Sequence, residues 1–254
     1  MITFRLLKTN HNSAAFNMAL DEILLERINQ GLAQPCLRFY GWQPAAISIG
    51  YFQSLTAEVN VQRCQELGID IVRRQTGGGA VFHDQEVTYS IHLPLALNLV
   101  PVKILDSYQR ICQAIIIGLA EFNLTAQFVP LNDIVVHGKK ISGNAQTRKK
   151  GIILQHGTIL REVDVDKMFE LLKVPNEKLK DKLISDVKQR VIGINQITAK
   201  PYTYAEVVAA LIKGFKQEFS EIEFKADTLT TAEIELAQQL AVEKYSNNNW
   251  TNQR

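Results

Sequence analysis

A double arginine that leads into three glycines is the stretch of this sequence best suited to chemistry. Arg73 and Arg74 are followed by Gly77, Gly78 and Gly79, and then by apolar, strand-like residues. Glycine lets backbone N–H groups approach an anion closely, and arginine supplies charge-assisted hydrogen bonds. The spacing matches neither G-x-x-x-x-G-K-[ST] nor G-x-G-x-x-G. Taken alone, the stretch predicts either an anion-binding loop or a glycine-rich turn beside two solvated arginines.

A second stretch places a lysine among small and hydrogen-bonding residues. Lys140 lies in a β-like segment, after Asp133 and before Ser142 and Gly143. If this segment faces the glycine loop, the Lys140 ammonium could stabilise negative charge that develops on a phosphate or an acyl oxygen. The competing interpretation is an exposed Gly-Lys-Lys hairpin. Asp133 could hold a metal ion or orient an amine, but Asn132-Asp133 is equally typical of a turn.

Other residue types that often carry chemistry are interpreted here as structural. His83 is followed by Asp84 and then by Glu86, but consecutive strand residues alternate faces and do not converge on one ion. His83 is therefore expected to be mainly structural. The three cysteines are widely spaced and lack C-x-x-C pairing, which argues against a disulfide framework and a zinc site. Cys112 is expected on the core face of a helix.

Composition excludes several classes of function. The 254 residues, 46% hydrophobic and 21% charged, suit one globular domain. A net charge of +2 gives no long-range field that would recruit nucleic acid or an anionic membrane. No apolar run reaches the ~20 residues of a membrane span, and the N-terminus lacks a signal-peptide pattern. We therefore expect a cytoplasmic protein with neither a nucleic-acid nor a membrane partner.

The elements that must position these residues alternate irregularly between strands and helices. An amphipathic helix is expected over 104–122, and capping boxes at Thr203/Glu206 and Thr230/Glu233 predict two more helices. The pattern predicts an α+β fold whose central sheet is mixed, largely antiparallel and flanked by helices. The principal β-like runs cover 2–7, 36–42, 46–50, 69–73, 87–93, 124–129, 134–136, 140–142 and 152–160.

Several blocks of the sequence belong together: 38–42, 50–53, 73–74 with 77–84, 132–133, 138–143 and 155–157. Together they resemble the lipoate–protein ligase family, within the wider group of biotin–protein ligases and octanoyl transferases. The resemblance implies a single catalytic domain of the biotin/lipoate–protein ligase type over 1–254, with the family's accessory C-terminal domain absent. That absence predicts a separate accessory ligase subunit, or the use of preformed lipoyl-AMP.

The resemblance implies that ATP, with Mg²⁺, activates lipoate to lipoyl-AMP. The lipoyl group then passes to a lysine of an apo lipoyl domain, in E2 subunits of 2-oxoacid dehydrogenases or in the glycine cleavage H protein. Lys140 matches the family's catalytic lysine, and Asp133 is a candidate metal ligand. Adenylate binding falls, by resemblance, to Arg74, Gly77, Gly78, Gly79, Ala80, Val81, Phe82, His83, Lys140, Ser142 and Gly143.

Two rival interpretations remain open at this point. Octanoyl transferases that use cysteine carry the acyl group as a thioester on a residue shortly before the lysine motif. Residues 129–133 contain no cysteine, which favours the ATP-dependent ligase, although 144–148 and 155–157 also look like the transferase branch. The transferase would move octanoate from acyl carrier protein without ATP. The other rival is a non-catalytic module that binds an acyl-adenylate.

Overall fold

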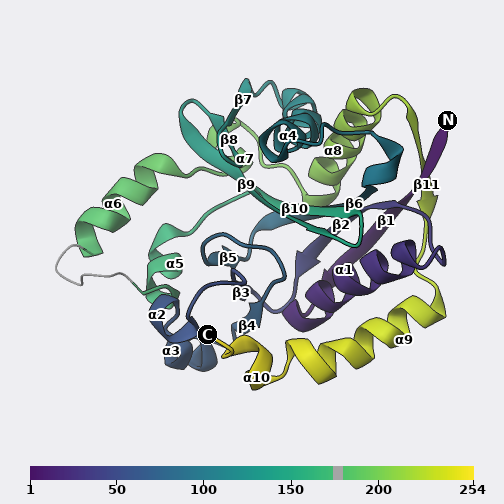
Figure 1. Cartoon of the computed structure of the whole chain (residues 1–254). Helices are drawn as coiled ribbons and strands as arrows, with labels where there is room; N and C mark the ends of the chain where they lie inside the picture. Colours follow the sequence, from purple (N-terminus) through teal and green to yellow (C-terminus); the bar gives the residue numbers. More distant parts are fainter. Residues whose placement is uncertain (174–179) are drawn as a thin grey trace.

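A mixed eight-stranded sheet forms the centre of the molecule (Figure 1), in a computed structural model that describes residues 1–173 and 180–254. Its first strand, β1, pairs in parallel with both β2 and β11, and every pair from β2 to β7 is antiparallel. The predicted α+β class and largely antiparallel sheet are therefore confirmed. In spatial order the strands are β11 (Ile222–Asp227), β1 (Ile2–Asn12), β2 (Cys36–Trp42), β6 (Glu86–Pro94), β10 (Ile152–Leu160), β9 (Lys139–Lys149), β8 (Asp133–Val136) and β7 (Ala126–Val129).

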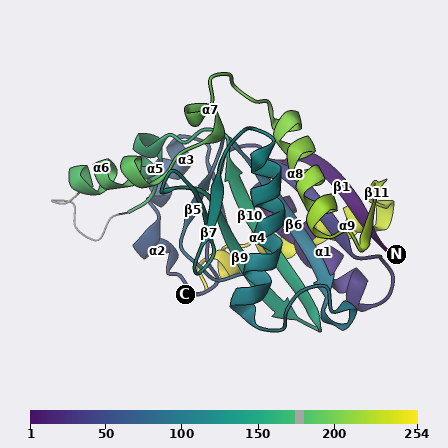
Figure 2. The same ribbon diagram turned by 90° about the horizontal axis from the view of Figure 1, so that it is seen from above.

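Helices cover both faces of this sheet, as Figure 1 and the view from above in Figure 2 show. On one face α4 (Ile104–Ala120) packs against α8 (Tyr204–Glu218), and on the other α1 (Ala14–Asn29) packs against α9 (Thr231–Leu240). Each helix layer buries an apolar side against the sheet, so the core forms two large clusters. Both predicted capping boxes are present, at Thr203 and Thr230.

A second, three-stranded sheet carries the glycine stretch. Its central strand β3 (Ala46–Ile49) pairs in parallel with β4 (Asp70–Arg73) and antiparallel with β5 (Val81–His83). The chain between β4 and β5 contains the glycines, which fixes the glycine loop at one end of this small sheet. The remaining elements are α2 (Leu55–Glu58), α3 (Val61–Glu66), η1 (Leu95–Leu97), α5 (Val165–Leu171), α6 (Lys180–Arg190), α7 (Ile194–Ile197), η3 (Ala241–Tyr245) and α10 (Asn248–Thr251).

The main departures from the predicted elements lie where pairing, and not local sequence, decides the structure. β9 extends far beyond the expected 140–142 because β10 pairs with it along nearly its whole length. The edge strand β11 carries only a short apolar pattern and is held by parallel pairing with β1. Among the described residues, no helix is long and apolar enough to cross a membrane.

Candidate active site

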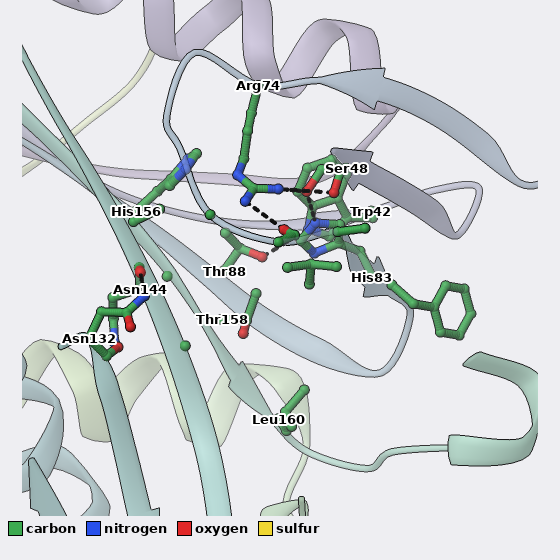
Figure 3. Close-up of a pocket in the computed structure, with 18 of the residues that line it drawn as sticks. Trp42, Ser48, Arg74, His83, Thr88, Asn132, Asn144, His156, Thr158 and Leu160 are labelled. Carbon is green, nitrogen blue, oxygen red and sulfur yellow. Dashed lines mark hydrogen bonds between the residues drawn. The ribbon is translucent and has the colours of Figure 1, made fainter. Parts of the chain in front are cut away.

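The large and small sheets enclose a cavity of about 280 Å³, drawn in Figure 3. The large sheet contributes residues of β2, β6, β9 and β10, and the small sheet contributes β3, β5 and the glycine loop. The two stretches singled out in the sequence thus meet at one cavity. The predicted site residues that line it are Arg74, Gly78, Gly79, Ala80, Val81, Phe82, His83, Lys140 and Gly143, whereas Gly77 and Ser142 are not among the lining residues.

Arg74 is held almost entirely by the protein itself. Nη2 donates to the carbonyl oxygens of Gly77 and Gly79 at 2.9 and 2.7 Å, and Nε donates to Thr76 Oγ1 at 3.2 Å. Nη1 donates to the backbone oxygen and to Oγ of Ser48, at 2.9 and 3.2 Å. All five guanidinium N–H groups therefore have protein acceptors. Two of these acceptors are carbonyl oxygens of the glycine loop, so the Arg74 side chain holds the loop in its conformation.

The environment of Arg74 contains no carboxylate partner among the described residues. Burial lowers the pKa of Arg74 to about 10 because a charged guanidinium loses hydration there. At neutral pH the group is still protonated. A buried positive charge thus lies against the cavity wall without a counter-ion, an arrangement that favours negative charge on a bound molecule.

The glycine loop makes a close approach that only glycine permits. A Cβ on Gly50 would lie 2.0 Å from the carbonyl oxygen of Gly78. Gly78 itself has φ +98°, in the left-handed region that side chains disfavour. In the part of the chain that the structure describes, no acceptor is found for the backbone N–H groups from Gly77 to Ala80. These donors are free to face an anion or a developing oxyanion.

Lys140 and Asp133 form an ion pair at the cavity. Lys140 Nζ lies 2.7 Å from Asp133 Oδ1, and both side chains are partly exposed, at 41% and 33%. A Cβ on Gly143 would lie 2.8 Å from Lys140 Nζ, so glycine leaves the space that the ammonium occupies. The Asp133 carboxylate faces a cation that the chain itself provides. No three His, Cys, Asp or Glu side chains gather as metal ligands in residues 1–173 and 180–254.

A chain of hydrogen bonds that sequence analysis missed runs through the cavity wall. Ser48 Oγ lies 2.7 Å from His83 Nε2, and His83 Nδ1 lies 2.7 Å from Glu86 Oε1. Thr88 Oγ1 donates to the same Glu86 oxygen at 2.6 Å and accepts from Trp42 Nε1 at 2.8 Å. His83 is also stacked on Trp42, with ring centroids 4.0 Å apart (Figure 3).

The position of His83 was foreseen only in part. His83 ends β5 and pairs with Glu86, which lies beyond the turn, at the start of β6. Ser48 offered no signal, because a serine in a short apolar strand is unremarkable in sequence. It becomes visible only when β3 pairs with β5 and sets Ser48 beside the histidine ring.

A second buried network lies behind the cavity, centred on Asp21 of α1. Arg38 Nη1 and Ser90 Oγ donate to Asp21 Oδ1, both at 2.8 Å, and Tyr40 Oη donates to Oδ2 at 3.2 Å. Burial raises the pKa of Asp21, but the Arg38 guanidinium, the hydrogen bond from His156 and the nearby His92 together outweigh it and hold the pKa well below its usual range. His156, which lines the cavity, reaches this network at 3.8 Å.

None of the three cysteines lines the cavity. Cys36, Cys64 and Cys112 are all buried and free. Burial raises the pKa of Cys64 to about 11 and that of Cys112 to about 12, and it raises the pKa of Cys36 as well. These thiols stay protonated at neutral pH, so no thiolate nucleophile is available at this site.

Comparison with known proteins places this site in a family. The pattern of the family described as lipoyl protein ligase A/B catalytic domain matches residues 13–216. The relative named octanoyltransferase LipM in Brevibacillus brevis is 37% identical, over 100% of this chain and 100% of that protein. A relative with the same name in Bacillus subtilis is 34% identical, over 99% of each chain.

Solved structures agree with the sequence relatives on the fold. A bipartite lipoate protein ligase from Thermoplasma acidophilum is 31% identical with a TM-score of 0.86, and the match covers 99% of this chain and 96% of that chain. Lipoate-protein ligase A bound with ATP is 30% identical with a TM-score of 0.81, over 99% and 98%.

Proposed function

Since the chain belongs to the lipoyl protein ligase A/B catalytic domain family, we propose that it is an octanoyltransferase, which moves an octanoyl group from acyl carrier protein to a lysine of a lipoyl domain. The acceptors would be lipoyl domains of E2 subunits or the glycine cleavage H protein. The reaction replaces a thioester by an amide and needs no ATP.

The ATP-dependent ligase expected from the sequence resemblance is corrected by the comparisons. The curated relatives that match over their whole length carry the name octanoyltransferase LipM. The expectation rested on the missing cysteine, and its weakness is physical: an acyl group can be carried by another nucleophile or transferred directly. ATP, Mg²⁺, lipoate and an accessory ligase subunit therefore do not enter the proposed reaction.

The observation that carries the proposal is the cavity itself. Its volume of about 280 Å³ lies just below the roughly 300–1,000 Å³ common for small-molecule sites, which suits one medium-length acyl chain. Its apolar wall would hold the alkyl chain and its polar wall the reacting carbonyl. The apolar wall is built from Met18, Trp42, Ala80, Val81, Phe82, Leu160, Val163, Met168 and Val191.

The donors around the cavity also fit acyl transfer. Attack on a thioester carbonyl places negative charge on its oxygen, and preorganised donors stabilise that charge. Lys140 Nζ and the backbone N–H groups near Gly78 are such donors. We propose that Lys140 acts in catalysis, with Asp133 holding its ammonium in place. Arg74 would support the site by fixing the loop and by its charge.

A reconstituted transfer reaction tests the proposal. Purified protein is incubated with octanoyl acyl carrier protein and an apo lipoyl domain, without ATP, and the acceptor is weighed by intact-mass spectrometry. The expected result is an acceptor heavier by one octanoyl group, modified at its lysine. A parallel reaction with lipoate and ATP is expected to give no modified acceptor. The proposal fails if only the second reaction proceeds, and a protein silent in both would be a non-catalytic module.

A further inference from the structure

We propose that Ser48 is the nucleophile that carries the acyl group, activated by His83 and oriented through Glu86, so that this chain forms a serine ester where cysteine-dependent transferases form a thioester. The inference rests on the proposed acyl transfer. It names the residue that accepts the acyl group, which neither the sequence resemblance nor the relatives' names assign.

The hydrogen-bond directions in this triad follow from the chemistry of its members. An ionised Glu86 can only accept, so the Nδ1–H of a neutral His83 donates to Glu86 Oε1 across 2.7 Å. His83 Nε2 is then the unprotonated nitrogen and accepts from the hydroxyl of Ser48 across 2.7 Å. This polarity is the one a general base needs to remove the serine proton.

The surroundings lock this arrangement in place. Trp42 stacks on the His83 ring with 16° between the planes, and Thr88 donates a second hydrogen bond to Glu86 Oε1. Glu86 Oε2 is buried without a hydrogen-bond partner within the described residues. Leaving a carboxylate oxygen unpaired costs stability, and such a cost is typical of groups retained for function.

The cavity supplies the other parts that a serine nucleophile requires. Ser48 and His83 both line it. Arg74 Nη1 lies 3.2 Å from Ser48 Oγ, and its uncompensated charge favours the serine alkoxide as it forms. The free backbone N–H groups near Gly78 lie on the same wall and can receive the carbonyl oxygen.

The chain offers no thiol that could take this role. All three cysteines are buried away from the cavity, with pKa values raised by burial. Thr76 is bonded to His156 Nε2 at 2.7 Å, and Thr76 and Ser48 are equally buried, but of the two only Ser48 is among the cavity-lining residues. Ser48 is therefore the hydroxyl that combines a base, an orienting carboxylate and access to the cavity.

The proposed reaction balances in two steps. Ser48 Oγ attacks the thioester carbonyl while His83 Nε2 takes its proton, the C–S bond breaks, and His83 returns the proton to the leaving thiolate. The neutral lysine amine of the acceptor then attacks the serine ester and gives a proton to His83. The C–O bond breaks, an amide forms, and the proton returns to Ser48 Oγ.

Trapping the acyl-enzyme tests the inference. Wild-type protein is mixed with octanoyl acyl carrier protein in the absence of acceptor, quenched in acid, weighed intact and digested for peptide mapping. We expect one octanoyl group on the peptide that contains Ser48. In Ser48→Ala the adduct should disappear and acceptor octanoylation should fall by at least about 10³-fold. Ser90→Ala is the matched control, because Ser90 is a buried serine bonded to Asp21 outside the cavity.

Ser48→Cys provides a signature that a structural serine would not give. Its adduct should be a thioester cleaved by neutral hydroxylamine, whereas the wild-type oxygen ester should resist the same treatment. A variant with all three native cysteines changed to serine should still form the wild-type adduct. Thermal unfolding of each variant verifies that the protein is folded.

The outcomes separate this inference from the proposed function. If wild-type protein octanoylates the acceptor but carries no label on Ser48, and folded Ser48→Ala retains the wild-type rate, the serine is not the carrier although the transferase assignment stands. Label on a cysteine would overturn the inference in the same way. Folded wild-type protein that transfers nothing would overturn both.

Discussion

Two buried polar networks lie on neighbouring parts of the large sheet, and they differ in how completely they are satisfied. The Asp21 network pairs its carboxylate with Arg38 and adds hydroxyl donors from Tyr40 and Ser90. Within residues 1–173 and 180–254, the Glu86 network leaves one carboxylate oxygen without a partner, and the nearby Arg74 has no carboxylate of its own. From the first network Tyr40 reaches the cavity wall, and from the second Ser48, His83 and Thr88 do.

This difference separates stability from function. A fully hydrogen-bonded buried ion pair fixes the packing of α1 on the sheet, because removing either partner leaves a buried charge. A buried network with an unpaired polar atom lowers the stability of the fold, and the unpaired atom can form a hydrogen bond when a ligand binds. The comparison predicts that changes in the Asp21 network lower stability, whereas changes in the Ser48, His83 and Glu86 network lower activity.

The largest effect is expected when the same substitution is made in each network. His83→Asn should lower the rate of acceptor octanoylation by about 10²–10⁴-fold, because the variant loses its general base. His92→Asn is the matched control, since His92 is also buried and bonds to the backbone oxygen of Asp21. The control should keep its rate per folded molecule. Rates come from single-turnover transfer, and equal losses in both variants would erase the distinction between the networks.

Removing the centre of the satisfied network should cost the most stability. Asp21→Ala leaves the buried Arg38 guanidinium unpaired, which is expected to lower the free energy of unfolding by about 3–5 kcal/mol. Urea titration followed by tryptophan fluorescence measures the change. Thr88→Val, in the other network, should lower it by about 1–2 kcal/mol. A stability loss in Asp21→Ala no larger than that of Thr88→Val would contradict the assignment.

The sequence predicted what local patterns control. The helix over 104–122 and the two capping boxes depend on residues a few positions apart, and each is present in the structure. Lys140 was placed at the site through a motif, and it does line the same cavity as Gly78. Local sequence patterns were therefore enough to predict these helices and to identify the two stretches, around Gly78 and Lys140, that meet at the cavity.

The triad escaped sequence analysis because long-range pairing creates it. Ser48 is 35 residues from His83, and the two meet only through the antiparallel pairing of β3 with β5. Arg74 was expected to bind an anion directly, yet its N–H groups are taken by loop carbonyl oxygens and Ser48. No periodicity reveals which acceptors will surround a buried guanidinium.

A smaller effect is expected at the edge of the functional network. Lys140→Ala should lower the transfer rate by about 10²-fold, because the variant loses one donor to the developing oxyanion. Its partly exposed ion pair contributes at most about 1 kcal/mol to the free energy of unfolding. Lys139→Ala is the control, since Lys139 precedes it in β9 and is not among the cavity-lining residues. A wild-type rate in Lys140→Ala would remove the lysine from catalysis.

The smallest effect is a pH dependence of stability that belongs to the satisfied network. Burial lowers the pKa of His156, against the opposing effect of Asp21, and the Arg74 charge lowers it further. Burial likewise lowers the pKa of His92, where Arg38 adds to the effect. The unfolded chain then binds protons more readily than the folded one. The free energy of unfolding is therefore highest at pH values above about 6.5, the pKa of histidine in the unfolded chain. It decreases as the pH falls below that pKa.

Urea midpoints between pH 7.5 and pH 5.5 measure this loss, which we expect to be on the order of 1 kcal/mol. His156→Asn removes one of the two contributing groups, so its stability should fall less steeply with pH than that of the wild type. His137→Asn, at an exposed turn between β8 and β9, should keep the wild-type slope. If the slope were unchanged in His156→Asn and flattened in His137→Asn, the acid sensitivity would lie at the surface and not in the buried network around Asp21.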